Sequence, residues 1–381
     1  MKITSLFKDF FQSEKMGGFL LIICTIVSLF IANSSVGYSY TQFWESNLNG
    51  HSITHWINDG LMSIFFLLIG LELERELYKG ELSDFKNALF PIVSAIGGVL
   101  IPAGIYLYFN YGTSTQNGTG IPMATDIAFA IGVLALLGNK VPISLKIFLT
   151  ALAVIDDLIA IIVIAIFYTS SISLLHLGIA LLIWAILFIL NRRKVYSLIP
   201  YLIGGVGMWY CMLHSGIHST IAGVILAFVI PFGNGDEKSS SYKLQHLLHK
   251  PVALFILPLF ALANTCIVFS SSWSNELFTK EGIGILIGLV IGKPIGIMLF
   301  SGLAVLIGLC TLPKGLQWKH IFGVGLLAGI GFTMSIFITL LAFNDPVFIS
   351  TGKISILFAS LIAGITGLIV LKLMLKGKAH D

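Results

Sequence analysis

The chain has 381 residues, 56% of them hydrophobic and only 10% charged, with a formal net charge of +4. A soluble domain carries about 25% charged residues, and the mean hydropathy here is +0.96. This composition excludes an ordinary soluble protein and predicts a polytopic membrane protein. The spans are predicted to be helical, because a membrane β-barrel would show alternating segments of about ten residues instead.

Twelve membrane-spanning helices are predicted, with no soluble domain anywhere in residues 1–381. Each apolar run has roughly the ~20 residues that cross a bilayer as a helix. The first run follows three lysines but lacks a small-residue cleavage site, so it is interpreted as a span and not as a signal peptide. The predicted spans lie near 17–34, 58–78, 88–110, 115–137, 143–169, 173–190, 196–212, 215–231, 251–269, 282–304, 318–343 and 350–374. The longest hydrophilic stretch, 232–250, is predicted to be a flexible cytoplasmic loop.

The distribution of basic residues predicts the orientation of the chain. With the N-terminus inside, all but three of the 22 lysines and arginines fall in cytoplasmic segments, as the positive-inside rule requires. The exceptions are Lys280 and Lys353, which would lie outside, and Lys293, which lies within a span. Both termini are therefore expected to be cytoplasmic. The net positive charge follows from this bias, so no nucleic-acid partner is expected.

Four ionisable residues are predicted to lie within the membrane. Asp126 is in "GIPMATDIAFAIG", Asp156 and Asp157 are adjacent in "ALAVIDDLIAI", and Lys293 is in "IGLVIGKPIGIMLF". Four unpaired charges at mid-membrane would cost roughly 10–14 kcal/mol at ~2.5–3.5 kcal/mol each. They must therefore face the protein interior or water and find partners. Two structural ion pairs are one alternative, but three acids and one base leave a surplus that needs a mobile cation or a proton.

The adjacent aspartates suggest how ions are exchanged. Neighbouring helical positions point ~100° apart, so one of Asp156 and Asp157 can reach Lys293 while the other faces a cavity. Carboxylate oxygens suit Na⁺ or Li⁺, by extension of the preference of hard cations for oxygen ligands. Protonation removes the charge that binds the metal ion, so protons and sodium would compete for one site, which is the basis of an antiporter. The four cysteines lie in apolar segments without metal-ligand spacing, and no cofactor is expected.

Two of the predicted spans carry signs of a helix break. In span four, Pro122 disfavours helical angles at the preceding residue, and Thr125 and Asp126 can bond free backbone groups as at an N-cap. Span eleven contains "GVGLLAGIGFTMS", in which Gly329 and Gly331 disfavour helix by ~1 kcal/mol each; tight helix packing is an alternative reason for these glycines.

The two interrupted spans occupy corresponding places in triplets of opposite direction, spans three to five and ten to twelve. This predicts inverted-topology repeats at approximately 88–169 and 282–374, with the site between them. At the crossing of the broken helices, like ends would face each other, each with a partial charge of ~0.5 that is positive at N-termini and negative at C-termini. Asp126 could neutralise the N-terminal ends and Lys293 the C-terminal ends.

Seven motifs together resemble the NhaA-type bacterial sodium/proton antiporters, over about residues 12–372 and in family order. They are "GLELEREL", "MATDIAFAIGVLALLG", "VIDDLIAI", "HSGIHSTIAGV", "LPLFALANT", "IGKPIGI" and "GIGFTMSIFI". The resemblance implies an inner-membrane protein that exports one Na⁺ or Li⁺ for two protons by alternating access. It also implies that Asp157 is the main cation ligand, that Asp156 pairs with Lys293, and that Thr125 and Asp126 lie in the crossing.

The resemblance further implies regulation by pH and a homodimer. Family members are activated at alkaline pH and associate through an external hairpin, which here would be 34–56. The residues that match the family's pH-response positions are Glu72, Arg75, Glu76, His218, His246 and His249. Without the resemblance, these residues are interpreted as a solvated helix end and a polar loop, and His218 as a cap. One departure is Gln245, where characterised relatives carry an acid, and this predicts a shifted or flatter pH profile.

Proteins of other classes fit the sequence less well. A prenyl transferase motif Asp-Asp-x-x-Asp would need an acid where Ala160 stands, and an intramembrane aspartyl protease would need Gly-x before Asp157, where Ile155 and Asp156 stand. The chain is therefore not expected to be an enzyme. A passive channel is disfavoured by a lysine paired to the cation site. A sodium-coupled solute symporter remains the alternative; it would need a polar pocket for an organic solute.

Overall fold

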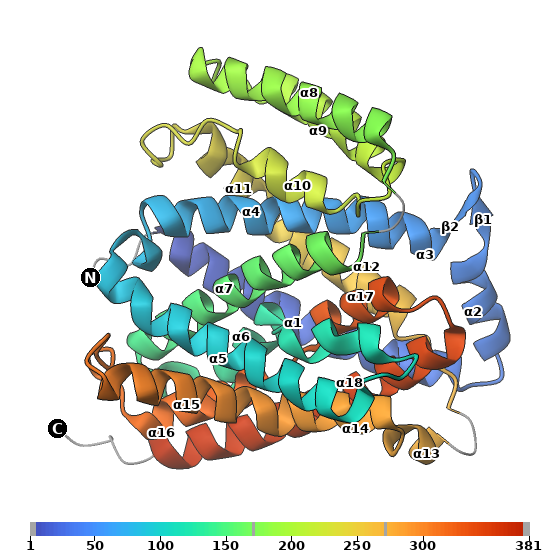
Figure 1. The fold of residues 1–381 in the computed structure, drawn as a ribbon, viewed down its shortest axis with the longest axis vertical. Helices are drawn as coiled ribbons and strands as arrows, with labels where there is room; N and C mark the ends of the chain where they lie inside the picture. Colours follow the sequence, from blue (N-terminus) through green and yellow to red (C-terminus); the bar gives the residue numbers. More distant parts are fainter. Residues whose placement is uncertain (1–4, 170–171, 270–272, 376–381) are drawn as a thin grey trace.

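The structure is a computed structural model that describes residues 5–169, 172–269 and 273–375. These residues are almost entirely helical (Figure 1). The described strands are β1 (Asn47–Leu48) and β2 (His51–Ser52), which pair antiparallel. The predicted all-helical class is therefore observed.

Nine helices of the described residues are long and apolar enough to cross a membrane, or ten when one bent pair is counted as a span. This makes the chain a multi-pass membrane protein. The spans are α1 (Ser5–Ala32), α3–η1–α4 (Ile53–His55, Trp56–Leu61, Met62–Tyr78), α5 (Phe85–Asn110), η3–α6 (Gln116–Met123, Ile127–Ala135), α7 (Ile143–Phe167), α8 (Leu174–Arg192), α11–η5–α12 (Ser240–Pro251, Val252–Ile256, Leu257–Asn264), α14–η6–α15 (Lys280–Ile287, Gly288–Gly292, Lys293–Leu306), α18 (Pro346–Leu375) and the bent pair α16–α17 (Trp318–Ala328, Phe332–Ala342).

The prediction of twelve full-length spans is confirmed only in part. The predicted spans 196–212 and 215–231 correspond to α9 (Ile199–Leu213), of 15 residues, and α10 (Ile221–Ala227), of seven. Both are shorter than the ~20 residues that cross a bilayer. A turn separates them, in which Gly216 adopts a φ of +84° that favours glycine. By length and composition, the described residues therefore contain nine or ten spans.

The predicted loop 232–250 is a loop only in its first part. Helix α11 begins at Ser240, and the hydroxyl of Ser239 caps it by accepting a hydrogen bond from the amide of Tyr242 at 3.3 Å. The predicted hairpin 34–56 contains α2 (Gly37–Glu45) as well as β1 and β2. The remaining short elements are η2 (Glu81–Ser83), η4 (Gly138–Lys140) and α13 (Trp273–Leu277).

The long helices run roughly side by side, and the strand pair projects from one edge of the bundle (Figure 1). The start of α1 and the end of α18 lie at the opposite edge. Helices α8 and α9 pack together at one end of the bundle, and α10 lies between them and α4. The ends of the described chain thus share one edge, away from the hairpin.

Close packing of α5 against α15 fixes the position of Lys293 relative to α5. The helices approach where Gly97 meets Gly296: a Cβ added at Gly97 would lie 2.2 Å from the carbonyl oxygen of Gly296. Small residues allow such backbone approach between membrane helices. Lys293 lies at the start of α15, just before this contact, and its side chain is fully buried.

Two helix breaks lie against each other in the middle of the bundle. The chain is extended from Ala124 to Asp126 between η3 and α6, and α16 and α17 meet at a bend of 47°. Each break satisfies backbone groups of the other. The amide of Asp126 donates to the carbonyl of Ile330 at 2.7 Å, and the hydroxyl of Ser335 donates to the carbonyl of Ile121 at 2.7 Å.

Candidate cation site at the crossing of two broken helices

Asp126 links the N-terminal ends of two helices. It is the N-cap of α6, where its Oδ1 accepts from the amide of Phe129 at 2.9 Å. Its Oδ2 accepts from the amide of Thr333 at 3.0 Å and from the hydroxyl of Thr333 at 2.5 Å, in the first turn of α17. Each helix N-terminus carries a partial charge of roughly +0.5. One buried carboxylate therefore balances both ends.

Lys293 forms an ion pair with Asp156 in the protein interior. The ammonium nitrogen lies 2.5 Å from Oδ2 of Asp156 and donates to Oγ1 of Thr125 at 3.0 Å. Burying both charges costs several kcal/mol each unless they are paired and hydrogen-bonded. The pair removes most of that penalty and ties α15 to α7.

Thr125 connects this ion pair to the broken helix α16. Its hydroxyl lies 2.7 Å from Oδ2 of Asp156 and 2.9 Å from the carbonyl oxygen of Ala328, where α16 ends. A hydroxyl has a single hydrogen to donate, so it donates to the carboxylate or to the carbonyl, but not to both at once. A change in the charge of Asp156 therefore alters a bond at the end of α16.

Asp157 lines a small cavity that neither Asp156 nor Lys293 lines. The cavity has a volume of about 20 Å³ and is also lined by Asp126, Thr333 and Glu72. A space of this size holds about one water molecule. Asp156 and Asp157 thus have different surroundings, which the ~100° between adjacent helical positions allows.

The described residues contain no group of three or more histidine, cysteine or acidic side chains that could hold a metal ion together. A single cation at Asp157 would therefore complete its shell with a hydroxyl, carbonyl or water oxygens. The hydroxyl of Thr333 lines the same cavity. Oxygen ligands of this kind suit hard cations, which retain water readily.

Oδ1 of Asp156 is the second point at which a proton or ion could bind. It is buried and has no hydrogen-bond partner among the described residues. Its companion oxygen, Oδ2, is already held by Lys293 and Thr125. Protonation at Oδ1 would neutralise the carboxylate and weaken its hold on Lys293.

The predicted pH-response residues divide into two separate regions. At the contact between α4 and α11, Nδ1 of His249 lies 3.6 Å from Oε1 of Glu72, and the guanidinium of Arg75 lies 5.3 Å from the ring centroid of Tyr242. His246 stacks on Tyr242 from the same helix. Glu76 lies near the end of α4, with its carboxylate over Gly80. His218 lies elsewhere, in the turn between α9 and α10.

The interpretation of this region as a solvated helix end and polar loop is wrong for His249, whereas His246 is exposed on the same helix. His249 is only 3% exposed and Gln245 is equally buried, both on a regular helix. Glu72 lines the Asp157 cavity as well. The α4–α11 contact therefore reaches the candidate cation site directly.

Some residues of the site were not singled out from the sequence. Thr333 was not predicted as a partner of Asp126, although a threonine two residues after a glycine break is typical of a helix start. Glu74 is buried and accepts from the hydroxyl of Ser241 at 3.1 Å, and no feature of the sequence singled it out. Ser360, whose hydroxyl accepts from the amide of Phe332 at 3.2 Å, also depends on the packing of α18 against the break.

Comparison with known proteins gives consistent matches over the full length. The family described as Na⁺/H⁺ antiporter 1 matches residues 8–371. The chain is 68% identical to the Na⁺/H⁺ antiporter NhaA 1 of Flavobacterium johnsoniae over 375 residues, which is 98% of both chains. It is 65% identical over 376 residues to the Na⁺/H⁺ antiporter NhaA of Flavobacterium psychrophilum, covering 99% of this chain and 98% of the relative. It is 47% identical over 381 residues to the Na⁺/H⁺ antiporter NhaA of Aliivibrio fischeri, covering 99% of this chain and all of the relative.

Proposed function

Because the chain belongs to the Na⁺/H⁺ antiporter 1 family, we propose that it exports Na⁺ in exchange for protons across a bacterial inner membrane. The observation that carries this proposal is that the two adjacent aspartates have different surroundings. Asp157 lines a cavity of about 20 Å³ beside Thr333 and Asp126, while Asp156 is held by Lys293. We propose that Asp157 binds the ion and that Asp156 releases the lysine.

The exchange cycle follows from the charges of these groups. Na⁺ or Li⁺ binds the ionised carboxylate of Asp157, with oxygen ligands from Thr333 and water. A proton that arrives at Asp157 removes this charge and expels the cation, while a second proton binds Oδ1 of Asp156 and loosens Lys293. Two protons then enter for each cation that leaves, so one net charge moves inward in each cycle and the exchange is electrogenic.

The broken helices supply the movement for alternating access. Asp126 balances two helix N-termini, and Thr125 links Asp156 to the end of α16. A change of charge at Asp156 therefore shifts hydrogen bonds of the break around Gly329 and Gly331. We propose that the inverted repeats, 88–169 and 282–374, move relative to each other about this crossing, with both termini on the cytoplasmic side.

Regulation by pH is assigned to the α4–α11 contact. Glu72 lines the Asp157 cavity and lies beside His249, so a proton gained or lost at this contact acts on the cavity. Deprotonation at rising pH would change the charge at the mouth of this cavity. The hairpin at 34–56 projects from the bundle (Figure 1) and is proposed as the contact of a homodimer within the bilayer.

A sodium-coupled solute symporter is the second candidate function. It would require a pocket for an organic solute next to the cation site. The cavity at Asp157 is about 20 Å³, which is far below the ~300–1,000 Å³ of ordinary small-molecule sites. This favours ion exchange over solute symport, and over an enzyme active site.

The proposal is tested in everted membrane vesicles from a host that lacks sodium antiporters, with an acridine dye that reports the pH gradient. NaCl, LiCl and KCl are added at pH 7 to 8.5 to vesicles with wild-type protein or Asp157→Asn. Dequenching by Na⁺ and Li⁺ in the wild type and its loss in the variant are expected. No dequenching by any cation, with well-expressed wild-type protein, would refute the exchange and direct the search to solute symport.

A further inference from the structure

A second cavity, of about 250 Å³, lies between the π-helical turn η1 and the end of α9. Three aromatic side chains, Trp56, Trp209 and Tyr210, form part of its wall together with the carboxylate of Asp59. None of its lining residues lines the Asp157 cavity. Its volume is more than ten times that of the Asp157 cavity. It therefore has room for a small organic molecule.

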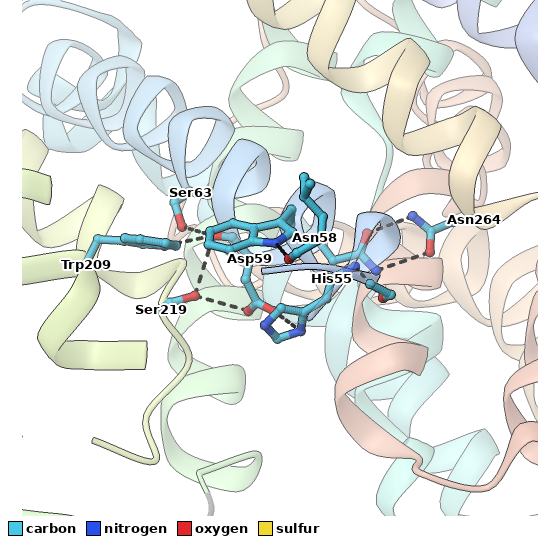
Figure 2. A network of polar contacts seen from close by, with 10 residues as sticks. His55, Asn58, Asp59, Ser63, Trp209, Ser219 and Asn264 are labelled. Carbon is cyan, nitrogen blue, oxygen red and sulfur yellow. Dashed lines mark hydrogen bonds and ion pairs between the residues drawn. The ribbon is translucent and has the colours of Figure 1, made fainter. Parts of the chain in front are cut away.

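The π-helical turn that forms this wall is held from two sides (Figure 2). On one side, the main-chain oxygen of Asp59 accepts from Nε1 of Trp209 at 2.9 Å and from the hydroxyl of Ser63 at 2.5 Å. On the other, the side-chain amides of Asn58 and Asn264 exchange hydrogen bonds of 2.8 and 3.3 Å. Turns of this type are frequent at functional sites. The aromatic and acidic walls are thus fixed before any ligand arrives.

The Asp59 carboxylate contributes charge but few free acceptor positions. Its Oδ1 accepts from the hydroxyl of Ser219 at 3.1 Å, and its Oδ2 lies 3.1 Å from Nδ1 of His55 (Figure 2). The described residues that line the cavity include no lysine or arginine. A hard metal ion needs a shell of free oxygen ligands, and a primary ammonium needs free hydrogen-bond acceptors. The Asp59 carboxylate keeps about two of its four lone-pair positions, which is too few for the shell of a hard metal ion and leaves a primary ammonium only part of the acceptors it needs.

A quaternary ammonium ion has no N–H donor and needs no free acceptor. It is attracted by the negative charge of Asp59 and by the faces of aromatic rings, among which tryptophan is the most favourable. We propose that this cavity binds a quaternary ammonium ion, either as a free solute such as choline or as the head group of a choline lipid. This site is separate from the exchange site and does not depend on the proposed ion exchange.

The test is calorimetric titration of the purified, full-length protein in detergent with choline chloride at pH 8.5. Ethanolammonium chloride is the matched control ligand, since it differs by the three methyl groups. Saturable binding of choline is expected, with ethanolammonium at least about tenfold weaker. Trp209→Leu and Asp59→Asn should each weaken choline binding about three- to tenfold.

Tyr210→Leu provides a variant that leaves the hydrogen bonds of the turn intact. Tyr210 is 58% exposed, and the bonds in Figure 2 do not involve its side chain. It should also weaken choline binding while the thermal unfolding temperature stays at the wild-type value. Absence of saturable choline binding, equal binding of the two ligands, or unchanged affinity in the Tyr210 and Trp209 variants would each overturn the proposal.

Nanodiscs separate the two sources of the ligand. The choline titration is repeated in discs of phosphatidylglycerol alone and in discs that also contain phosphatidylcholine. If the lipid head group occupies the cavity, the apparent affinity for free choline falls in the second kind of disc. If the affinity is the same in both, the ligand is a free solute.

Discussion

Lys293 and Asp156 form an ion pair of 2.5 Å between α15 and α7, with both side chains fully removed from solvent. Removal of one partner leaves an uncompensated buried charge, which costs about 3–5 kcal/mol. The Lys293–Asp156 pair therefore stabilises the fold, although the proposed exchange cycle requires it to open. Stability and exchange are coupled at this contact.

We expect Lys293→Gln and Asp156→Asn to lower the thermal unfolding temperature of the purified protein. Each leaves one charge without its partner. The double variant should recover part of the loss, since an amide pair can replace the ion pair without net charge. The measurement compares all four proteins at one scan rate, because unfolding of large proteins is often irreversible. Additive losses in the double variant would show that the two charges do not depend on each other.

We expect Thr333→Val to weaken the apparent affinity for Na⁺ by about tenfold or more. The substitution removes the hydroxyl bond to Asp126 and one oxygen ligand from the cavity; hydrogen bonds to charged groups contribute about 1.5–3 kcal/mol. Thr339→Val is the matched control, since its hydroxyl bonds only to the carbonyl of Ser335 in its own helix. The Na⁺ concentration for half-maximal dequenching measures the effect. Equal values for the two variants would exclude Thr333 from the site.

Parts of the site could be predicted from the sequence, because the cost of buried charge leaves few arrangements. Lys293 is the single basic residue near the middle of a predicted span, so an aspartate was expected beside it. The different surroundings of Asp156 and Asp157 follow from helical geometry alone. The contact between Thr333 and Asp126 could not be predicted, because it depends on how the two broken helices cross in space.

The hydropathy pattern also did not predict that α9 and α10 are short, or that α11 begins at Ser240. The stretch "GNGDEKSSSYKLQHLLHK" has the composition of a loop, but its second half forms a helix with buried Leu244. The signals were present as a serine cap at Ser239 and as Leu244 and Leu248 four residues apart. These two signals involve few residues, so the polar composition of the whole stretch led to the prediction of a loop.

We expect Gly296→Ala to destabilise the protein by about 1–3 kcal/mol, the usual cost of overpacking. The added Cβ would lie 2.1 Å from the carbonyl oxygen of Gly97, so α5 and α15 would have to separate. Gly302→Ala, on the same helix, has no neighbouring atom within 4 Å of the added Cβ and should be neutral or slightly stabilising. Unfolding temperatures of the two variants measure the difference. Because Lys293 lies one turn before Gly296, Gly296→Ala should also reduce exchange, and unaffected stability and exchange would contradict the packing argument.

Gln245 offers a test of pH regulation at the α4–α11 contact. It lies one helical turn before His249, and residues four apart share a helix face. A glutamate at position 245 would add a negative charge to the buried face of α11, beside His249 and the carboxylate of Glu72, so this contact would hold a proton up to a higher pH. We therefore expect Gln245→Glu to shift the activation of Na⁺/H⁺ exchange toward alkaline pH, with little change in the maximal rate. The measurement is the pH dependence of Na⁺-induced dequenching between about pH 6.5, the ordinary histidine value, and about pH 9.

Leu247→Glu is the matched control for this shift, because it adds the same charge to the exposed face of α11, where Leu247 is 66% exposed. Exposed charges are screened by water and salt, so its profile should match the wild type. A wild-type profile for Gln245→Glu would mean that His249 does not set the activation pH. Equal alkaline shifts in both variants would mean that the total charge of α11 matters and not the contact with His249. An alkaline shift in Gln245→Glu alone would place the pH response at the buried face of α11, next to the carboxylate of Glu72 that lines the Asp157 cavity.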